Sequence, residues 1–102
     1  MKALGFVELF WLETLAALDG LPRRRLIRGQ LRDGDNYCAL GALLRWRAWD
    51  VKNEMICFVG SNEEIAQMRK LIAANDSISG RRDARWRLMR DFVMKQIKYA
   101  KE

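Results

Sequence analysis

Residues 82–101 carry the pattern that most constrains how this chain can fold. Apolar residues recur there every three or four positions, and basic residues occupy the opposite side. The apolar positions are Trp86, Met89, Phe92, Val93, Ile97, Tyr99 and Ala100. The basic ones are Arg87, Arg90, Lys95, Lys98 and Lys101. This spacing predicts a long amphipathic helix with a basic exterior, and such a helix folds only if other elements cover its apolar face.

Residues 6–18 predict a first helix, which Gly20 and Pro22 bring to an end. Its apolar side is wider than an ordinary stripe, and Glu8, Glu13 and Thr14 are its solvent-directed residues. Two interpretations stay open. The helix is central to the core, or it is half covered by a second copy in a homodimer.

In the stretch "LRDGDNYCALGALL" (31–44), charged and turn-forming residues are followed directly by an apolar run. Asp33-Gly34 predicts a turn, and Asp35 or Asn36 is the expected N-cap of a helix over 37–49. The large residues of this helix fall on one side. Its small residues, Cys38, Gly41 and Ala42, fall on or near the other. Glycine is unfavourable inside a helix, so we expect close backbone packing at Gly41.

Ser61 and Glu64 have the spacing of a capping box and predict a helix from 61 to about 74. Ile65, Met68, Leu71 and Ile72 form its expected buried stripe, and Asn75 is the expected left-handed C-terminal residue.

The fold class that follows is mainly α: a compact single domain over residues 1–102, with about four helices. A chain of 102 residues suits one modest core. Two remaining segments, around 26–31 and 55–59, suggest a minor two-stranded β element. The run 55–59 is continuously apolar, so periodicity does not separate strand from helix there; its composition favours strand.

The chain has no histidine. This excludes Cys-His and Ser-His-Asp catalysis and every metal site that needs imidazole. Cys38 lies near an expected helix start, which favours a lowered thiol pKa, but no base is available to it, so we expect a small core residue. Asp33, Asp35 and Asp76 are expected in turns and caps. We therefore predict no enzyme, no cofactor and no metal; an enzyme using Cys38 or these carboxylates is the weaker alternative.

No apolar run approaches the length of a membrane span, and Glu8 and Glu13 interrupt the N-terminal one. We expect a cytoplasmic protein with two reduced thiols, Cys38 and Cys57. Peripheral membrane binding through the basic helix 82–101 is a further alternative, weakened because its aromatic residues are needed in the core.

Positive charge is concentrated in two blocks. Residues 23–52 hold eight Lys/Arg against three Asp/Glu, and residues 80–102 hold the same numbers. Trp residues alternate with arginines in "RWRAW" (45–49) and "RWR" (85–87), although a helix would direct Trp86 to the core and both flanking arginines outward. The pattern predicts contacts with nucleic acid or with an acidic or nucleic-acid-binding protein complex. The candidate binding residues are Arg23, Arg24, Arg25, Arg45, Arg47, Arg81, Arg82, Arg85, Arg87 and Arg90.

The stretch "RGQLRDGDNYCALGALL" resembles a family of small proteins of phages, prophages and their bacterial relatives. In that family, Arg-Gly-x-Leu-Arg leads into Tyr/Phe-Cys-x-Leu-Gly-x-Leu. An upstream run ending in Ala-Leu (11–18) and a downstream Asn75-Asp76 stand in comparable order, while "SISGRRDARWR" is more basic than the family's usual turn. The family has no assigned activity, so the resemblance transfers no catalytic residue. It implies a mobile-element accessory protein that binds host or phage machinery. The alternative to contact with nucleic acid is an inhibitor of a host-defence complex that acts purely by protein–protein contact.

Overall fold

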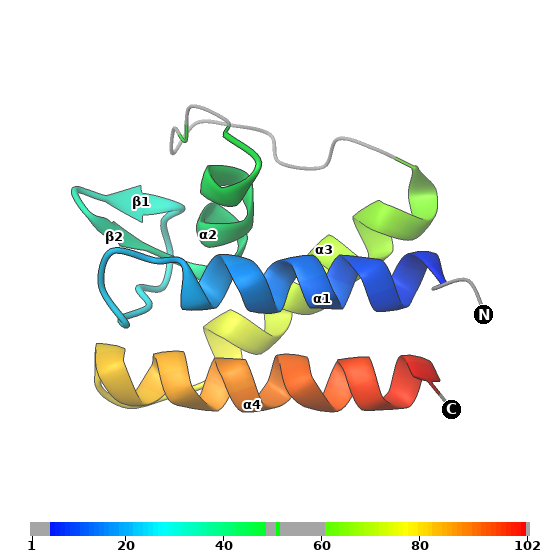
Figure 1. Cartoon of the computed structure of the whole chain (residues 1–102). Coiled ribbons are helices and arrows are strands. Elements are labelled where there is room, and N and C mark those ends of the chain that lie inside the picture. The colour runs from blue at the N-terminus through cyan, green and yellow to red at the C-terminus, as the bar shows by residue number, and fades with distance from the viewer. Residues whose placement is uncertain (1–4, 49–50, 52–60, 102) are drawn as a thin grey trace.

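The computed structural model describes residues 5–48, 51 and 61–101. Within them it confirms a mainly α architecture with four helices and one small two-stranded antiparallel sheet (Figure 1). The elements are α1 (Phe6–Asp19), β1 (Arg32–Asp33), β2 (Asn36–Tyr37), α2 (Ala39–Trp46), α3 (Asn62–Ser77) and α4 (Arg82–Lys101).

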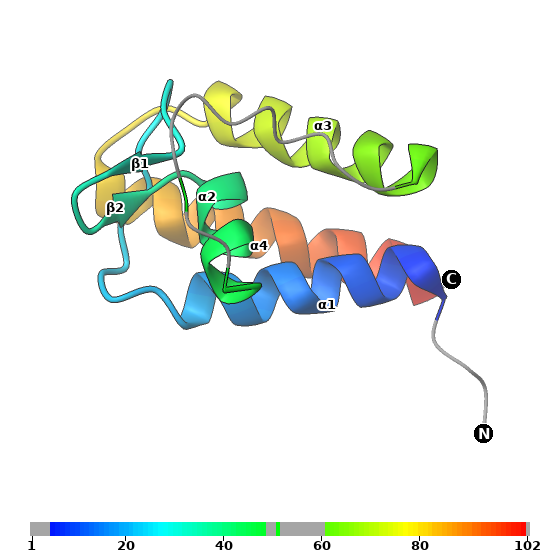
Figure 2. The same cartoon turned by 90° about the horizontal axis from the view of Figure 1, so that it is seen from above.

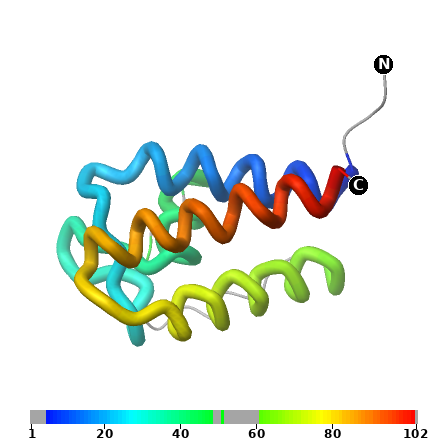
Figure 3. Tube along the Cα trace, turned by 90° about the horizontal axis from the view of Figure 1, so that it is seen from below, coloured from blue at the N-terminus to red at the C-terminus, as the bar shows by residue number. Residues whose placement is uncertain are grey.

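Helices α1 and α4 lie side by side and antiparallel, and this pair forms the most extensive helix contact (Figures 1 and 3). Helix α3 runs along the other side of the core, and the short α2 packs between α1 and α3 (Figure 2). Consequently α1 and α3 finish at the end of the molecule where α4 begins. The segment after α1 (residues 20–31), with the hairpin β1–β2, also lies at this end (Figure 2).

Trp11 is the largest fully buried side chain of the core. Its ring meets Phe10 and Phe92 edge-on, at centroid distances of 5.0 and 5.8 Å, and its Nε1 donates to Gln67 Oε1 at 3.2 Å. The predicted apolar face of α4 is confirmed, with Trp86, Met89, Val93 and Ile97 buried. Tyr99 departs from it. It lies at the margin of that face in the last turn and is 59% exposed.

The outward side of α1 differs from the prediction. Glu8 and Thr14 are buried, while Phe6 and Leu9 are exposed. The Thr14 hydroxyl is satisfied inside the core because it donates to the Phe10 carbonyl at 2.8 Å. A helical threonine can hide its polarity in this way, so residue type alone did not predict its side.

The β element is present but displaced from its predicted place. Its strands flank the turn Gly34-Asp35, with Arg32 opposite Tyr37 and Asp33 opposite Asn36. Gly34 has φ 61°, as a tight hairpin requires. Of the predicted strand 26–31, only Leu26 forms a bridge, parallel to Tyr37; the proposed partner 55–59 lies outside the described residues. Pairing across the turn closes a much shorter loop than the predicted pairing would.

Helix α2 begins later than predicted because Asn36 and Tyr37 are taken up by β2. Cys38, with extended backbone, is the N-cap, and its Sγ accepts a hydrogen bond from the Gly41 N–H at 3.3 Å. The expected caps Asp35 and Asn36 are therefore wrong. The expected close packing at Gly41 is confirmed, since a Cβ there would lie 2.1 Å from the Leu31 carbonyl oxygen.

The Ser61 cap of α3 is confirmed, because its hydroxyl accepts from the Glu64 N–H at 3.2 Å. The predicted end is wrong: α3 continues to Ser77, and Asn75 is a helical residue that is only 2% exposed. Its side chain accepts from the Ala39 N–H at 3.0 Å and donates to the Ile27 carbonyl at 3.1 Å. These two bonds tie α3 to the start of α2 and to the segment after α1.

Candidate functional site

The two basic blocks of the sequence meet at the start of α4. The segment after α1 is anchored there by buried Leu21, Leu26 and Ile27. The Leu26 N–H donates to the Arg82 carbonyl at 3.0 Å, and the Ile27 N–H donates to Tyr37 at 3.1 Å. Arg23, Arg24 and Arg25 lie between Leu21 and Leu26 and are thereby held beside the first turns of α4.

A first hollow opens between the segment after α1 and the first turn of α4. Arg25, Arg81, Arg82 and Asp83 line it, and its volume is about 380 Å³. Arg81 Nε lies 3.9 Å from Asp83 Oδ1, and the two side chains are 92% and 60% exposed. An ion pair this long and this exposed contributes little. Arg81 is thus little neutralised by Asp83, and Arg25, Arg81 and Arg82 line the hollow as exposed residues.

A second hollow of about 440 Å³ lies one turn further along α4, where Arg24, Trp86 and Arg87 are among its lining residues. The Arg24 guanidinium carbon lies 5.0 Å from the centroid of the Trp86 ring, within the range of a cation–π contact. Trp86 is itself fixed, because its Nε1 donates to the Leu18 carbonyl at 3.0 Å. We call the exposed arginines of the two hollows the arginine surface: Arg24, Arg25, Arg81, Arg82 and Arg87.

Two predicted binding residues of α4 are committed elsewhere. Arg90 donates to both carboxylate oxygens of Asp19, at 2.8 and 3.3 Å, and these hydrogen bonds raise its pKa. Arg85, expected to point outward, is buried. Burial lowers its pKa, with a further contribution from the charge of Arg28. Its Nη2 donates to the Asn75 carbonyl at 2.6 Å.

Arg28 was not among the predicted site residues, and its hydrogen bond to the end of α3 indicates a structural role. Its Nη1 donates to the Asp76 carbonyl at 3.2 Å, next to the carbonyl that Arg85 binds. The last turn of α3 contains no basic residue of its own. Arg28 and Arg85 therefore supply, from two other segments, the positive charge that favours a helix C-terminus. No signal within residues 61–77 could have identified these partners.

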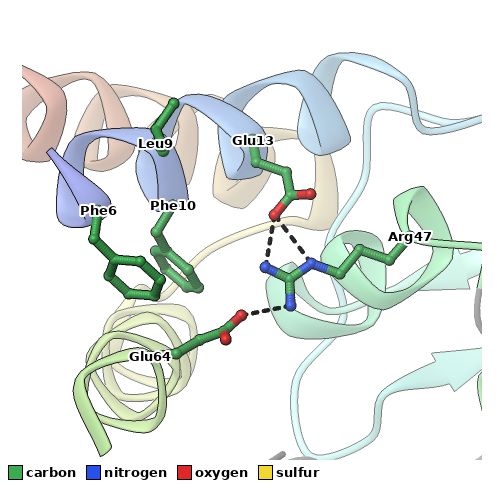
Figure 4. Close-up of a pocket in the computed structure, with 6 residues that line it drawn as sticks. All are labelled: Phe6, Leu9, Phe10, Glu13, Arg47 and Glu64. Carbon is green, nitrogen blue, oxygen red and sulfur yellow. Dashed lines mark hydrogen bonds and ion pairs between the residues drawn. The ribbon is translucent and has the colours of Figure 1, made fainter. Parts of the chain in front are cut away.

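Arg47 is neutralised at a different place. Figure 4 shows its guanidinium between two carboxylates, Glu13 of α1 and Glu64 of α3, each 2.6 Å away. Partial burial works to lower the pKa of Arg47, but the hydrogen bonds to both glutamates outweigh it, and the net pKa is raised. A third hollow of about 310 Å³ adjoins this cluster, with Phe6, Leu9 and Phe10 as its apolar lining. We call Glu13, Arg47 and Glu64 the clamp, because it links α1, the end of α2 and α3.

The remaining candidates lie away from the hollows. Arg45 is exposed, but its Nη1 donates to the Gly20 carbonyl at 3.2 Å and its guanidinium carbon lies 5.9 Å from the Tyr37 ring centroid. Arg23 is exposed on the segment after α1. Trp49 and Cys57 lie outside the described residues.

Cys38 is buried, as expected for a core residue, and its sulfur caps α2. Asp33 is exposed in β1, Asp35 is exposed in the hairpin turn, and Asp76 is exposed near the end of α3. Among the described residues, no group of three or more Cys, Asp and Glu side chains is arranged to hold a metal ion.

The chain was compared with protein-family models, with curated proteins and with solved structures, and none of the three comparisons gave a match. Within the described part of the chain, none of the helices combines the length and apolarity needed to cross a membrane.

Proposed function

We propose that this protein is a non-enzymatic binding protein whose arginine surface contacts the phosphate backbone of nucleic acid. One observation carries the proposal: basic residues more than fifty positions apart in the sequence line the same hollows at the start of α4. Arginine suits this role because its planar fork of donors matches phosphate oxygens and its charge is constant at any physiological pH.

The position of the arginines within α4 supports the same proposal. A helix N-terminus already carries a partial positive charge, so Arg81 and Arg82 are electrostatically unfavourable there, and only Asp83 among the first-turn residues offsets them. Residues that oppose the stability of their own element are typical of functional sites. An anionic ligand would relieve this repulsion.

Binding is best measured with fluorescein-labelled duplex DNA, single-stranded DNA and single-stranded RNA, by anisotropy at several salt concentrations. Each arginine that neutralises a phosphate of a duplex contributes about 0.9 to the slope of log K against log salt. Arg25→Gln/Arg81→Gln/Arg82→Gln is expected to reduce that slope by about two to three, and to weaken binding at low salt by at least about tenfold.

A matched control is available further along α4. Lys95, Lys98 and Lys101 are exposed, and Lys95→Gln/Lys98→Gln/Lys101→Gln removes the same formal charge. We expect this control to retain most of the affinity. Equal losses in the two triple variants would mean that net charge alone drives binding, and no binding of the wild-type protein to any of the three probes at low salt would refute the proposal.

A second candidate is an acidic surface on a nucleic-acid-binding protein complex, the partner class expected of a phage or mobile-element accessory protein. One observation favours it: Asp19, Asp83 and Asp91 lie among the arginines, so the surface carries a mixed charge pattern that a protein of complementary pattern matches better than a uniformly negative phosphate backbone does. Co-purification from a host lysate would then depend on the arginine surface and not on the three lysines.

A further inference from the structure

We infer that the hollow lined by Arg25, Arg81 and Arg82 binds the terminal phosphomonoester of a nucleic-acid strand. The inference rests on the proposed function and goes beyond it, because it assigns this hollow to the end of a strand. The second hollow, with Arg24 and Arg87, would contact the backbone that follows.

The distribution of the charges is the first argument. Three arginines from two separate segments line one hollow of about 380 Å³, which has a single acidic lining residue, Asp83. In the second hollow three arginines lie beside two acidic residues, Asp19 and Asp91, and Arg90 is paired with Asp19. Charge gathered at one point suits a ligand whose own charge is gathered at one point. An internal stretch of backbone instead presents single charges spread along its length.

The chemistry of the phosphate is the second argument. A phosphomonoester carries close to two negative charges at neutral pH and has three terminal oxygens that accept hydrogen bonds. An internal phosphodiester carries one charge and has two such oxygens. Three arginine forks can each engage a terminal oxygen of the monoester, so the monoester should bind more tightly to this hollow than a diester.

Asp83 gives the site an internal test. Its carboxylate lines the same hollow and lies 3.9 Å from Arg81 Nε, so it competes with the ligand for that guanidinium. Asp83→Asn removes the competing charge but retains the size of the side chain. It is therefore expected to strengthen binding of a strand that ends in a phosphate.

The deciding experiment compares one single-stranded oligonucleotide of about ten nucleotides in three forms: with a 5′-phosphate, with a 3′-phosphate and with hydroxyls at both ends. We expect a phosphorylated form to bind the wild-type protein about fivefold to tenfold more tightly than the hydroxyl form, which corresponds to one further charge-assisted hydrogen bond. Inorganic phosphate should compete with the phosphorylated form better than chloride at equal ionic strength.

Three variants separate the possible outcomes. Arg82→Gln should abolish the preference for the phosphorylated end, Arg87→Gln should weaken both forms equally and keep the preference, and Asp83→Asn should enlarge it. Circular dichroism confirms that each variant is folded. Equal binding of all three oligonucleotides by the wild-type protein would overturn this inference and leave the proposed function intact; no binding of any would overturn both.

Discussion

The triplet Arg-Trp-Arg occurs twice in this chain, and the two copies have opposite environments. At 45–47, at the end of α2, Trp46 is 49% exposed and Arg47 is held between two glutamates. At 85–87, near the start of α4, Trp86 is 6% exposed and Arg85 is buried, while Arg87 is exposed beside a hollow. The same triplet thus contributes Arg47 to the clamp in one place and Arg87 to the arginine surface in the other.

The difference follows from the phase of each helix and from the acids nearby. Trp86 lies on the face of α4 that packs against α1. Its neighbours Arg85 and Arg87 therefore lie on the two sides of that face. At the end of α2, Arg47 is the residue that reaches the carboxylates of α1 and α3. Arg47 is therefore neutralised and links three helices, whereas the exposed Arg87 lines a hollow together with Arg24 and Trp86.

The largest expected difference between the two copies is at the tryptophan. Trp86→Ala removes a buried ring and its hydrogen bond to Leu18, and should cost about 3–5 kcal/mol of unfolding free energy. Trp46→Ala removes a half-exposed ring and should cost about 1 kcal/mol or less. Urea unfolding followed by far-ultraviolet circular dichroism measures both. Similar costs would contradict the contrast drawn between the two triplets.

The difference in unfolding free energy should be smaller when the last arginine of each triplet, Arg47 or Arg87, is replaced. Arg47→Ala leaves Glu13 and Glu64 facing one another without the cation, and should cost about 1–2 kcal/mol, since the cluster is only partly buried. Arg87→Ala should change the unfolding free energy by less than about 0.5 kcal/mol. The same denaturation assay at low and at high salt tests this, because screening should reduce the cost only for Arg47→Ala.

The smallest expected change in unfolding free energy is a gain of stability. Arg81→Gln/Arg82→Gln removes two positive charges from the amino end of α4 and should raise the unfolding free energy, by about 0.3–1 kcal/mol at low ionic strength. Thermal unfolding at low salt is the appropriate measurement. A loss of stability would indicate that these arginines support the fold, and would remove one of the arguments for a binding surface.

The sequence anticipated those features that depend on residues close together in the chain. The helix over 82–101 matches α4, the cap at Ser61 is present, and Gly41 lies where backbone approaches closely. Local rules failed where a distant segment supplied a better partner. Asparagine is a residue type common at helix ends, yet Asn75 lies within α3 because its side chain forms hydrogen bonds with the backbone of Ile27 and Ala39.

The candidate site was predicted as a residue type and not as a place. Of the ten arginines selected from the sequence, five form the arginine surface, and Arg47, Arg85 and Arg90 are bound by distant groups. Charge blocks are visible in a sequence, but the partners are not. Acids bind Arg47 and Arg90, a backbone carbonyl binds Arg85, and only the fold brings these groups within hydrogen-bond distance.

By itself, the sequence determined the helical class, the apolar faces and the excess of arginine, because hydrophobic spacing and charge are properties of neighbouring residues. The tertiary structure alone decided which arginines are neutralised, which are buried and which meet at the start of α4. The physical reason is that such contacts join residues far apart in the chain. The hydrogen bond from Leu26 to Arg82 spans more than half the chain, and no local sequence pattern encodes which distant segments lie together.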